Sequence, residues 1–200
     1  MVSKIKNITF LGHADAKETD DVFKSAFEIA RICAQKGYII INGGGPGVMK
    51  ASTLGAKSVG GKAIGVTFYP KDIPNFEGRD ETNKVDQLIV VKNYLARTLK
   101  LFELGHLFII FNGGTGTISE FGMAWGLAKL YFGHHKPVIL YGDFWNEIIL
   151  AFTKTMYITS VEKQVFKIAQ SPEEVLSAIE GFEKQLSTNQ HKHGKPILSI

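Results

Sequence analysis

Short apolar runs alternate with longer segments of helical periodicity along most of the chain. The short runs are rich in β-branched and aromatic residues, which is typical of buried strands. They are Ile8–Leu11, Tyr38–Ile41, Ala63–Phe68, Leu88–Val91, Leu107–Phe111, Val138–Tyr141 and an edge strand at Val165–Ile168. The segments between them predict helices over Asp20–Lys36, Val48–Val59, Asn93–Leu104, Thr117–Leu130, Trp145–Met156 and from Ser171 to about Leu186.

Strands that alternate with helices predict a parallel sheet covered on both faces. We therefore predict an α/β fold of the Rossmann-like, doubly wound type, with a mainly parallel sheet. A (β/α)₈ barrel fits less well, because it needs eight units and about 250 residues. Neither a repeat nor a low-complexity linker divides the chain, so residues 1–187 are predicted to form one domain and 188–200 a loose basic tail. Tyr69–Lys84, rich in proline and charge, is expected to be an exposed loop.

Two helix boundaries have specific signals. Gly37 follows the first predicted helix, where a residue in the left-handed conformation ends many helices. Ser171-Pro172-Glu173-Glu174 combines an N-cap, a proline at the first helical position and acidic residues in the first turn.

Composition places the chain among ordinary globular proteins. Hydrophobic residues make up 44% and charged residues 21%, which excludes a mostly disordered chain. No apolar run approaches the roughly 18 residues of a membrane span, and the N-terminus lacks the apolar stretch of a signal peptide. Cys33 is the single cysteine and cannot form an internal disulfide, so we expect a reducing, cytoplasmic location. Cys33 lies on the predicted core face of its helix and is expected to be inert.

The charge balance gives no nucleic-acid signature. The net charge is +4, and Lys192 and Lys195 of the acid-free tail contribute two of those charges. The body of the protein is therefore only slightly basic, and we expect neither nucleic acid nor membrane as a partner.

Two glycine clusters stand between a strand and a helix. The first is Asn42-Gly43-Gly44-Gly45-Pro46-Gly47-Val48-Met49, and the second is Asn112-Gly113-Gly114-Thr115-Gly116-Thr117. Both are placed at the carboxyl ends of strands, where open α/β sheets bind ligands. Glycines allow a close backbone approach, and the amides that begin the following helix can bind an anion. The alternative is that each cluster is a tight turn without a ligand.

Neither cluster matches a standard nucleotide motif. The Gly-Lys-Ser/Thr of a Walker A loop is absent, and no carboxylate stands about 20 residues beyond the first cluster to hold the ribose of NAD. No cofactor is therefore predicted.

Two charged residues accompany the second cluster. Glu120 is predicted in the first turn of the helix that follows it, either as a carboxylate over the phosphate loop or as a capping and helix-dipole residue. Arg97 lies on the preceding helix, either facing the ligand site or on a solvated face.

Together these residues resemble the LOG (Lonely guy) family of cytokinin-activating nucleoside 5′-monophosphate phosphoribohydrolases, which was first described as lysine decarboxylases. The family signature Pro-Gly-Gly-x-Gly-Thr-x-x-Glu corresponds to residues 112–120, and the family loop Gly-Gly-Gly-Pro-Gly-Val-Met occurs unchanged at residues 43–49. Arg97 matches a family arginine, and His134-His135-Lys136-Pro137-Val138 is similar to His-Lys-Lys-Pro-Val. The resemblance covers roughly Ile8 to Leu150.

The chain departs from the family pattern at four positions. Asn112 replaces the signature proline, Thr98 stands where a lysine usually follows the arginine, Lys50 where many members have Glu, and His13 where Ser is common. These departures bear on which substrate is bound and on whether it is turned over, and they do not affect the predicted fold. Lysine decarboxylation is not predicted, since it normally requires pyridoxal phosphate and no lysine here can be assigned to it.

The resemblance implies hydrolysis of the N-glycosidic bond of a nucleoside 5′-monophosphate, with adenine or N6-modified adenine as the base. Arg97 and Glu120 are then the catalytic residues. The phosphate- and nucleotide-binding residues are Gly12, Gly43, Gly44, Gly45, Gly47, Met49, Gly113, Gly114, Thr115, Gly116 and Thr117.

Two other hypotheses stay open. The same loops suit a non-catalytic binding protein or carrier for a phosphorylated ligand, such as the relatives thought to carry molybdenum cofactor. A nucleic-acid-binding Rossmann module is the third hypothesis and depends only on the basic tail.

Three further features have simple interpretations. His134-His135 is predicted to be a loop before a strand rather than a metal site, because no carboxylate or cysteine stands at ligand spacing. Trp125 and Trp145 suit a core or an interface. The helix Phe121–Leu130 is apolar around much of its circumference, which predicts a homodimer.

Overall fold

The computed structural model describes residues 5–70 and 79–189. Within these residues the chain forms seven strands and six helices, which alternate except that β4 follows β3 with no described helix between them. The elements are β1 (Asn7–Leu11), α1 (Asp21–Gln35), β2 (Ile39–Asn42), α2 (Val48–Lys57), β3 (Ala63–Phe68), β4 (Gln87–Val91), α3 (Tyr94–Leu104), β5 (Leu107–Ile110), α4 (Thr115–Leu130), β6 (Val138–Tyr141), α5 (Phe144–Thr155), β7 (Phe166–Ala169) and α6 (Pro172–Asn189).

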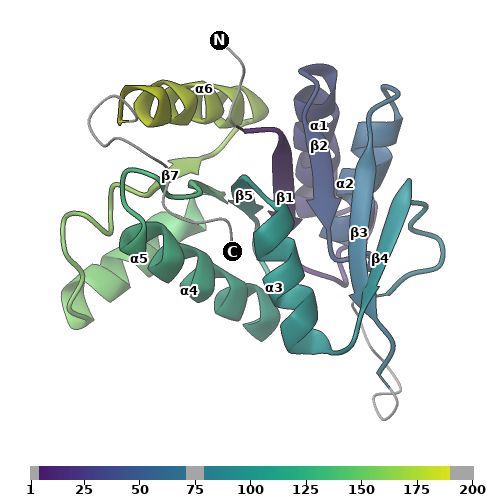
Figure 1. Cartoon of the computed structure of the whole chain (residues 1–200), viewed down its shortest axis with the longest axis horizontal. Helices are drawn as coiled ribbons and strands as arrows, with labels where there is room; N and C mark the ends of the chain where they lie inside the picture. Colours follow the sequence, from purple (N-terminus) through teal and green to yellow (C-terminus); the bar gives the residue numbers. More distant parts are fainter. Residues whose placement is uncertain (1–4, 71–78, 190–200) are drawn as a thin grey trace.

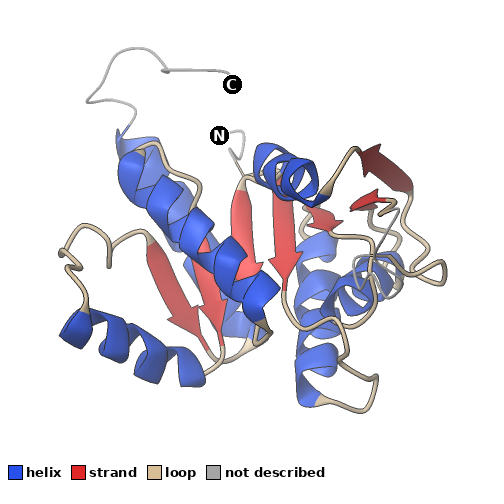
Figure 2. Ribbon diagram, turned by 90° about the horizontal axis from the view of Figure 1, so that it is seen from below, coloured by secondary structure: helices blue, strands red, loops and turns tan. Residues whose placement is uncertain are grey.

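All strands belong to one parallel sheet in the order β4-β3-β2-β1-β5-β6-β7. The register aligns Ile8 of β1 with Ile40 of β2 on one side and with Leu107 of β5 on the other. Helices lie in front of and behind the strands (Figures 1 and 2). The predicted doubly wound, Rossmann-like fold is therefore confirmed.

Each face of the sheet has its own hydrophobic core. One core joins the sheet to α1, α2 and α6, with Phe10, Ile29 and Phe182 fully buried. The other joins it to α3, α4 and α5 and contains Leu101, Phe121 and Trp145. The central strands have apolar side chains on both faces, which explains why they appear in the sequence as continuous apolar runs rather than alternating ones.

Element boundaries differ from prediction mainly in α4 and α6. Helix α4 begins at Thr115 instead of Thr117, with Gly114 as an extended N-cap. Helix α6 begins as predicted, because the Ser171 hydroxyl accepts a hydrogen bond from the Glu174 amide, but it continues to Asn189. The prediction of a loose tail over residues 188–200 is wrong at residues 188–189, which belong to α6, and the rest of that tail lies outside the described residues. The predicted exposed loop Tyr69–Lys84 is described only in part, and residues 71–78 lie outside that part. Its described residues are mostly exposed, but Asn83 is buried.

The order of the strands reverses between β1 and β5. From β1 the chain proceeds through β2 and β3 to the β4 edge, and it then returns to place β5 on the other side of β1. Loops that leave the carboxyl ends of β1 and β5 diverge at such a point and open a crevice. Both glycine clusters follow strands at this end of the sheet. Among the described residues, no helix is long and apolar enough to cross a membrane.

Candidate functional site

A pocket of about 490 Å³ opens at the carboxyl ends of β1, β2, β3 and β5. It therefore coincides with the reversal in strand order. Its lining residues are Phe10, Leu11, Gly12, His13, Ala14, Asp15, Gly43, Met49, Phe68, Tyr94, Arg97, Gly114, Thr115, Gly116, Thr117 and Glu120.

The second glycine cluster contributes the start of α4 to this pocket. Gly114, Thr115, Gly116 and Thr117 all line it. The first amides of a helix have no partner within the helix and carry its positive dipole end, so they suit an anion such as phosphate. Gly113 lies just outside the pocket against Thr117, and a Cβ on Gly113 would overlap the Thr117 hydroxyl. A side chain at Gly113 would therefore displace a lining residue.

The first glycine cluster is mostly turned away from the pocket. Gly43 and Met49 line it, whereas Gly44, Gly45 and Gly47 are buried and do not. Three successive carbonyls of this loop accept hydrogen bonds from other segments. Those of Gly43, Gly44 and Gly45 bond to Arg97 Nη2 at 3.1 Å, the Asp80 amide at 3.0 Å and Asn83 Nδ2 at 2.8 Å, respectively.

Glycine is required at Gly47 by its backbone and by its neighbours. Its φ of 60° lies in the left-handed region. A Cβ there would also overlap the carbonyl oxygens of His13 and Ala14 in the loop after β1. That loop is held against both glycine clusters, because the His13 carbonyl accepts from the Val48 amide and the His13 amide donates to Asn112.

Arg97 lies beneath the first glycine loop and is only 5% exposed. Its Nε donates to the Val66 carbonyl at 3.0 Å, and its Nη2 donates to the Gly43 carbonyl. Its Nη1 lies 4.0 Å from Glu120 Oε1. Burial lowers the pKa of the guanidinium from its usual value, and Glu120 partly offsets this effect. The alternative of a solvated helix face for Arg97 is therefore wrong.

Glu120 lines the pocket and is 7% exposed. Because α4 begins two residues earlier than predicted, Glu120 stands in the second turn rather than the first, and the capping alternative does not apply. Burial raises the pKa of its carboxyl to about 7, and the nearby Arg97 guanidinium opposes that rise. The group therefore changes charge near neutral pH, where a catalytic acid or base is most effective.

A sequence profile described as the SLOG cluster4 family matches residues 5–176. The chain belongs to this family. The predicted LOG-like relationship is thereby confirmed, and the matched region includes both glycine clusters, Arg97 and Glu120.

Two curated relatives of this SLOG chain reach 30% identity. An uncharacterized protein of Archaeoglobus fulgidus is 31% identical over 139 residues, which cover 70% of this chain and 86% of that protein. A cytokinin riboside 5′-monophosphate phosphoribohydrolase of Mycobacterium tuberculosis is 30% identical over 122 residues. The second match covers 60% of this chain and 62% of that protein, so it spans less than two thirds of the relative.

Among solved structures, the molybdenum cofactor binding protein of Rippkaea orientalis is similar over nearly the whole chain. The TM-score is 0.65 at 26% identity, covering 90% of this chain and 98% of that one. The proteins similar to this chain thus include one named as a phosphoribohydrolase and one that binds molybdenum cofactor.

Sequence patterns missed several residues that the SLOG fold brings to the pocket. Phe68 ends β3, Tyr94 begins α3, and Asp15 belongs to the loop after β1, whereas His13 of the same loop is one of the four departures from the family pattern in the sequence. The only signal available for them was their position at the ends of predicted strands or the start of a predicted helix. Thr98 is buried in α3, where its hydroxyl donates to the Tyr94 carbonyl at 3.3 Å, and it does not line the pocket.

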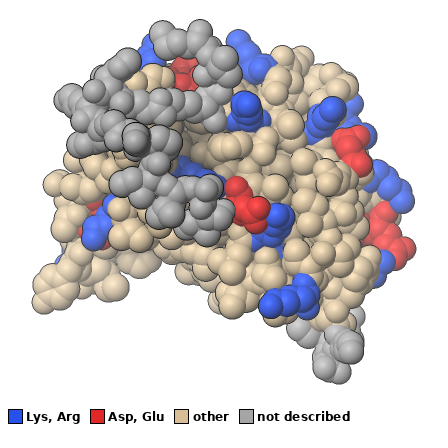
Figure 3. Space-filling view, viewed as in Figure 1, with Lys and Arg blue, Asp and Glu red and all other residues tan. Residues whose placement is uncertain are grey.

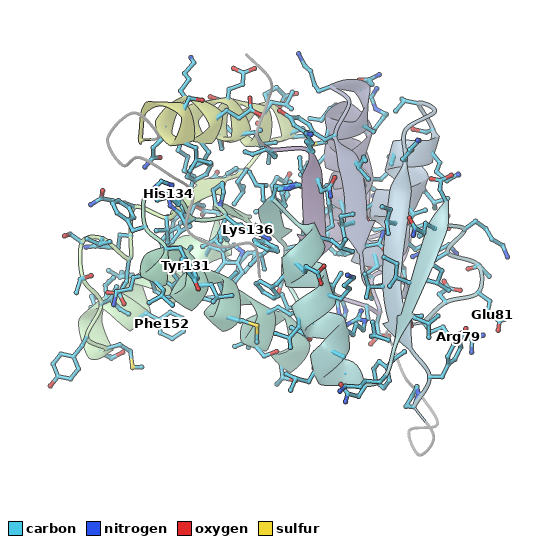
Figure 4. All side chains as sticks on the ribbon, in the orientation of Figure 1. Arg79, Glu81, Tyr131, His134, Lys136 and Phe152 are labelled. Atoms are coloured by element: carbon cyan, nitrogen blue, oxygen red, sulfur yellow. The ribbon has the colours of Figure 1, made fainter. Side chains whose placement is uncertain are left out.

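The segment His134–Lys136 lies in the loop between α4 and β6, as predicted (Figure 4). His135 is buried and stacks on Phe132 with ring centroids 5.7 Å apart, and burial lowers its pKa to about 4. Lys136 Nζ donates to the carbonyls of Phe102 and Glu103 at the end of α3. No cluster of three potential metal ligands occurs in the described part of the chain.

Proposed function

We propose that this protein hydrolyses the N-glycosidic bond of a nucleoside 5′-monophosphate and releases the free base and ribose 5-phosphate. The observation that carries the proposal is the buried Arg97–Glu120 pair in the wall of a pocket that also contains the start of α4. The 30% identity to a phosphoribohydrolase supports it.

The start of α4 is the proposed phosphate site. The amides of Thr115, Gly116 and Thr117, together with the two threonine hydroxyls, supply donors to the 5′-phosphate. Binding the phosphate there fixes the sugar relative to Glu120, which lies on the same helix, five residues after Thr115. Binding energy from this remote group then serves to orient the reacting bond.

Glu120 is the proposed catalytic carboxylate. Cleavage of an N-glycosidic bond develops positive charge on the sugar ring, as in other glycosyl hydrolysis. In its ionised form, Glu120 stabilises this charge and orients the attacking water or the ribose hydroxyls. A carboxylate is more effective in this role inside a water-poor pocket than in bulk solvent, because charges interact more strongly there.

Arg97 acts electrostatically in this scheme. It stays protonated and therefore cannot donate a proton to the leaving base. Its guanidinium holds the Gly43 carbonyl and keeps Glu120 in place, so the pocket wall and the carboxylate are positioned by one side chain. Adenine and N6-modified adenine are the proposed bases on family similarity alone.

The test is base release from purified protein. AMP and an N6-substituted AMP are incubated with the wild type, and free base is measured by chromatography. Glu120→Gln is expected to lower kcat at least 100-fold without loss of fold, because it removes the charge and keeps the shape. Glu103→Gln, at an exposed glutamate on α3, is the matched control. Turnover by Glu120→Gln at the wild-type rate would refute the proposal.

A carrier without catalysis is the second candidate, favoured by the similarity to a molybdenum cofactor binding protein. It predicts that a phosphorylated ligand stays bound without conversion, and that Glu120→Gln leaves this binding unchanged. Retention of intact nucleotide by the wild type, with no base released over hours, would favour the carrier over the hydrolase.

We further propose that two copies of the chain associate through α3 and α4. Both helices lie on one side of the sheet (Figure 1), and most of the surface there is uncharged (Figure 3). Leu95 and Leu99 of α3 and Ile118 and Leu130 of α4 each expose more than half of their surface. A patch of this kind on a small protein usually marks an interface.

A further inference from the structure

The pocket contains few positive charges for a site that binds phosphate. Arg97 is the only lysine or arginine among the described residues that line it. Its guanidinium already donates to the Val66 and Gly43 carbonyls and faces Glu120. Any side-chain donor to a phosphate at the start of α4 must therefore come from another residue of the wall.

Tyr94 has the position and the chemistry for this role. It is the first residue of α3, where Asn93 caps the helix by accepting from the Ala96 amide. Its ring stands edge-on to Phe68, with centroids 6.3 Å apart and an interplanar angle of 76°. Both rings line the pocket, so Phe68 supports the orientation of Tyr94.

The hydroxyl of Tyr94 reaches across from α3 to α4. A Cβ built on Gly116 would lie 3.4 Å from it, which places the hydroxyl in contact distance of the first turn of α4. It forms no hydrogen bond with any described residue. A free donor thus stands beside the helix start.

We propose that Tyr94 is a specificity-determining residue of this pocket, with its hydroxyl donating a hydrogen bond to the 5′-phosphate of the bound nucleotide. This inference rests on the proposed function. Tyr94 distinguishes nucleotides from nucleosides, because only a ligand with a phosphate has a charged acceptor at that place. Thr98, four residues further along α3, is buried and does not line the pocket, so it offers no donor there.

The test compares AMP with adenosine. Binding of both ligands to the wild type, Tyr94→Phe and Tyr131→Phe is measured by calorimetry. Tyr131 is an exposed tyrosine just beyond the opposite end of α4 and serves as the matched control (Figure 4). Phenylalanine keeps the ring and its contact with Phe68, so the fold is preserved.

Tyr94→Phe is expected to weaken AMP binding about 10-fold, which is typical for loss of one hydrogen bond to a charged group, and to change adenosine binding less than twofold. In turnover, the same variant raises KM for AMP and leaves kcat nearly unchanged. Unchanged AMP binding, or an equal loss for AMP and adenosine, would overturn the assignment of Tyr94.

The outcomes separate this inference from the proposed function. If AMP binds, Tyr94→Phe weakens it selectively and no base is released, then Tyr94 is confirmed and the hydrolase proposal fails. If base is released but Tyr94→Phe binds AMP normally, only the inference fails. If the wild type binds no nucleotide at all, both are refuted.

Discussion

Glu120 and Arg97 are both buried in the pocket wall, with Oε1 of Glu120 4.0 Å from Nη1 of Arg97. The pair illustrates two competing effects on one carboxyl. Burial favours the neutral acid, the guanidinium favours the carboxylate, and burial prevails, which raises the pKa of Glu120 to about 7. Glu120 is therefore protonated at mildly acidic pH and ionised above neutrality.

This balance predicts the pH dependence of the proposed reaction. Because the scheme uses ionised Glu120, kcat/KM for AMP is expected to rise with pH and to level off above about pH 7. The second ionisation of the substrate phosphate, near pH 6, contributes a separate step. Rates measured from pH 5 to 9 test the profile.

The pH profile of Glu120→Gln is the comparison. Its residual activity is expected to show only the step that comes from ionisation of the substrate phosphate. A wild-type rate that falls as pH rises through 7 would mean that the protonated acid is the active form. The role of Glu120 would then be proton donation to the base instead of charge stabilisation.

At the scale of elements, the two glycine clusters look alike in sequence and differ in structure. The second presents the start of α4 to the pocket, while the first has its carbonyls turned to Arg97, Asp80 and Asn83. The spacing of glycines predicted both turns and their place at the strand ends. It could not predict which loop stays open, because the partners of the first loop lie about 35 to 55 residues further along the chain.

Long-range contacts also explain the other differences between prediction and structure. Strand and helix positions follow local periodicity and were predicted to within a few residues. Arg97 is buried because Gly43 and Val66 accept its donors, and no local pattern on α3 reveals that. Tyr94 and Phe68 enter the pocket only through the packing of α3 beside β3.

Gly43→Ala is the sharpest test at this scale. A Cβ at Gly43 would overlap the Arg97 guanidinium, which is itself buried and cannot move into water. We expect the free energy of unfolding to fall by about 2–4 kcal/mol, as for other overpacked buried sites. Urea denaturation measures it.

Gly114→Ala is the control, because a Cβ at Gly114 meets nothing within 4 Å and the φ of −88° suits alanine. Its stability is expected to stay within about 1 kcal/mol of the wild type. Equal stability of the Gly43→Ala variant would show that Arg97 does not hold the first glycine loop in solution.

At the scale of the whole molecule, the sheet and its two cores leave α4 apolar on both its inner and its outer side. Phe121 and Trp125 face the core, while Ile118 and Leu130 face outward. Gly122 and Gly126, which lie between Ile118 and Leu130 in the sequence of α4, are exposed, and a Cβ at either position would have no neighbour within 4 Å. A second chain could approach this stretch of helix closely.

Light scattering tests the proposed association. The wild type is expected at about twice the chain mass of 22.1 kDa. Leu99→Asp, at an exposed leucine of the apolar patch, is expected to give the single-chain mass, because burying an unpaired carboxylate in an interface is costly. Leu54→Asp, at an exposed leucine of α2 on the other side of the sheet, should leave the mass unchanged. A wild type that is monomeric at micromolar concentration would contradict the proposal.

The anchoring of the first glycine loop also limits how the sequence can diverge. Its three carbonyls depend on Arg97 in α3 and on two residues that precede β4, and Asn42 at the end of β2 accepts from the Gly44 amide. Loss of the side chain of Asn42, Asn83 or Arg97 leaves a buried carbonyl or amide unsatisfied unless another residue changes with it, whereas Asp80 donates through its main chain and its side chain is not constrained by this contact. Among descendants of one ancestor, we therefore expect positions 42, 83 and 97 to be exchanged as a set or not at all, even though Asn42 and Asn83 do not line the pocket.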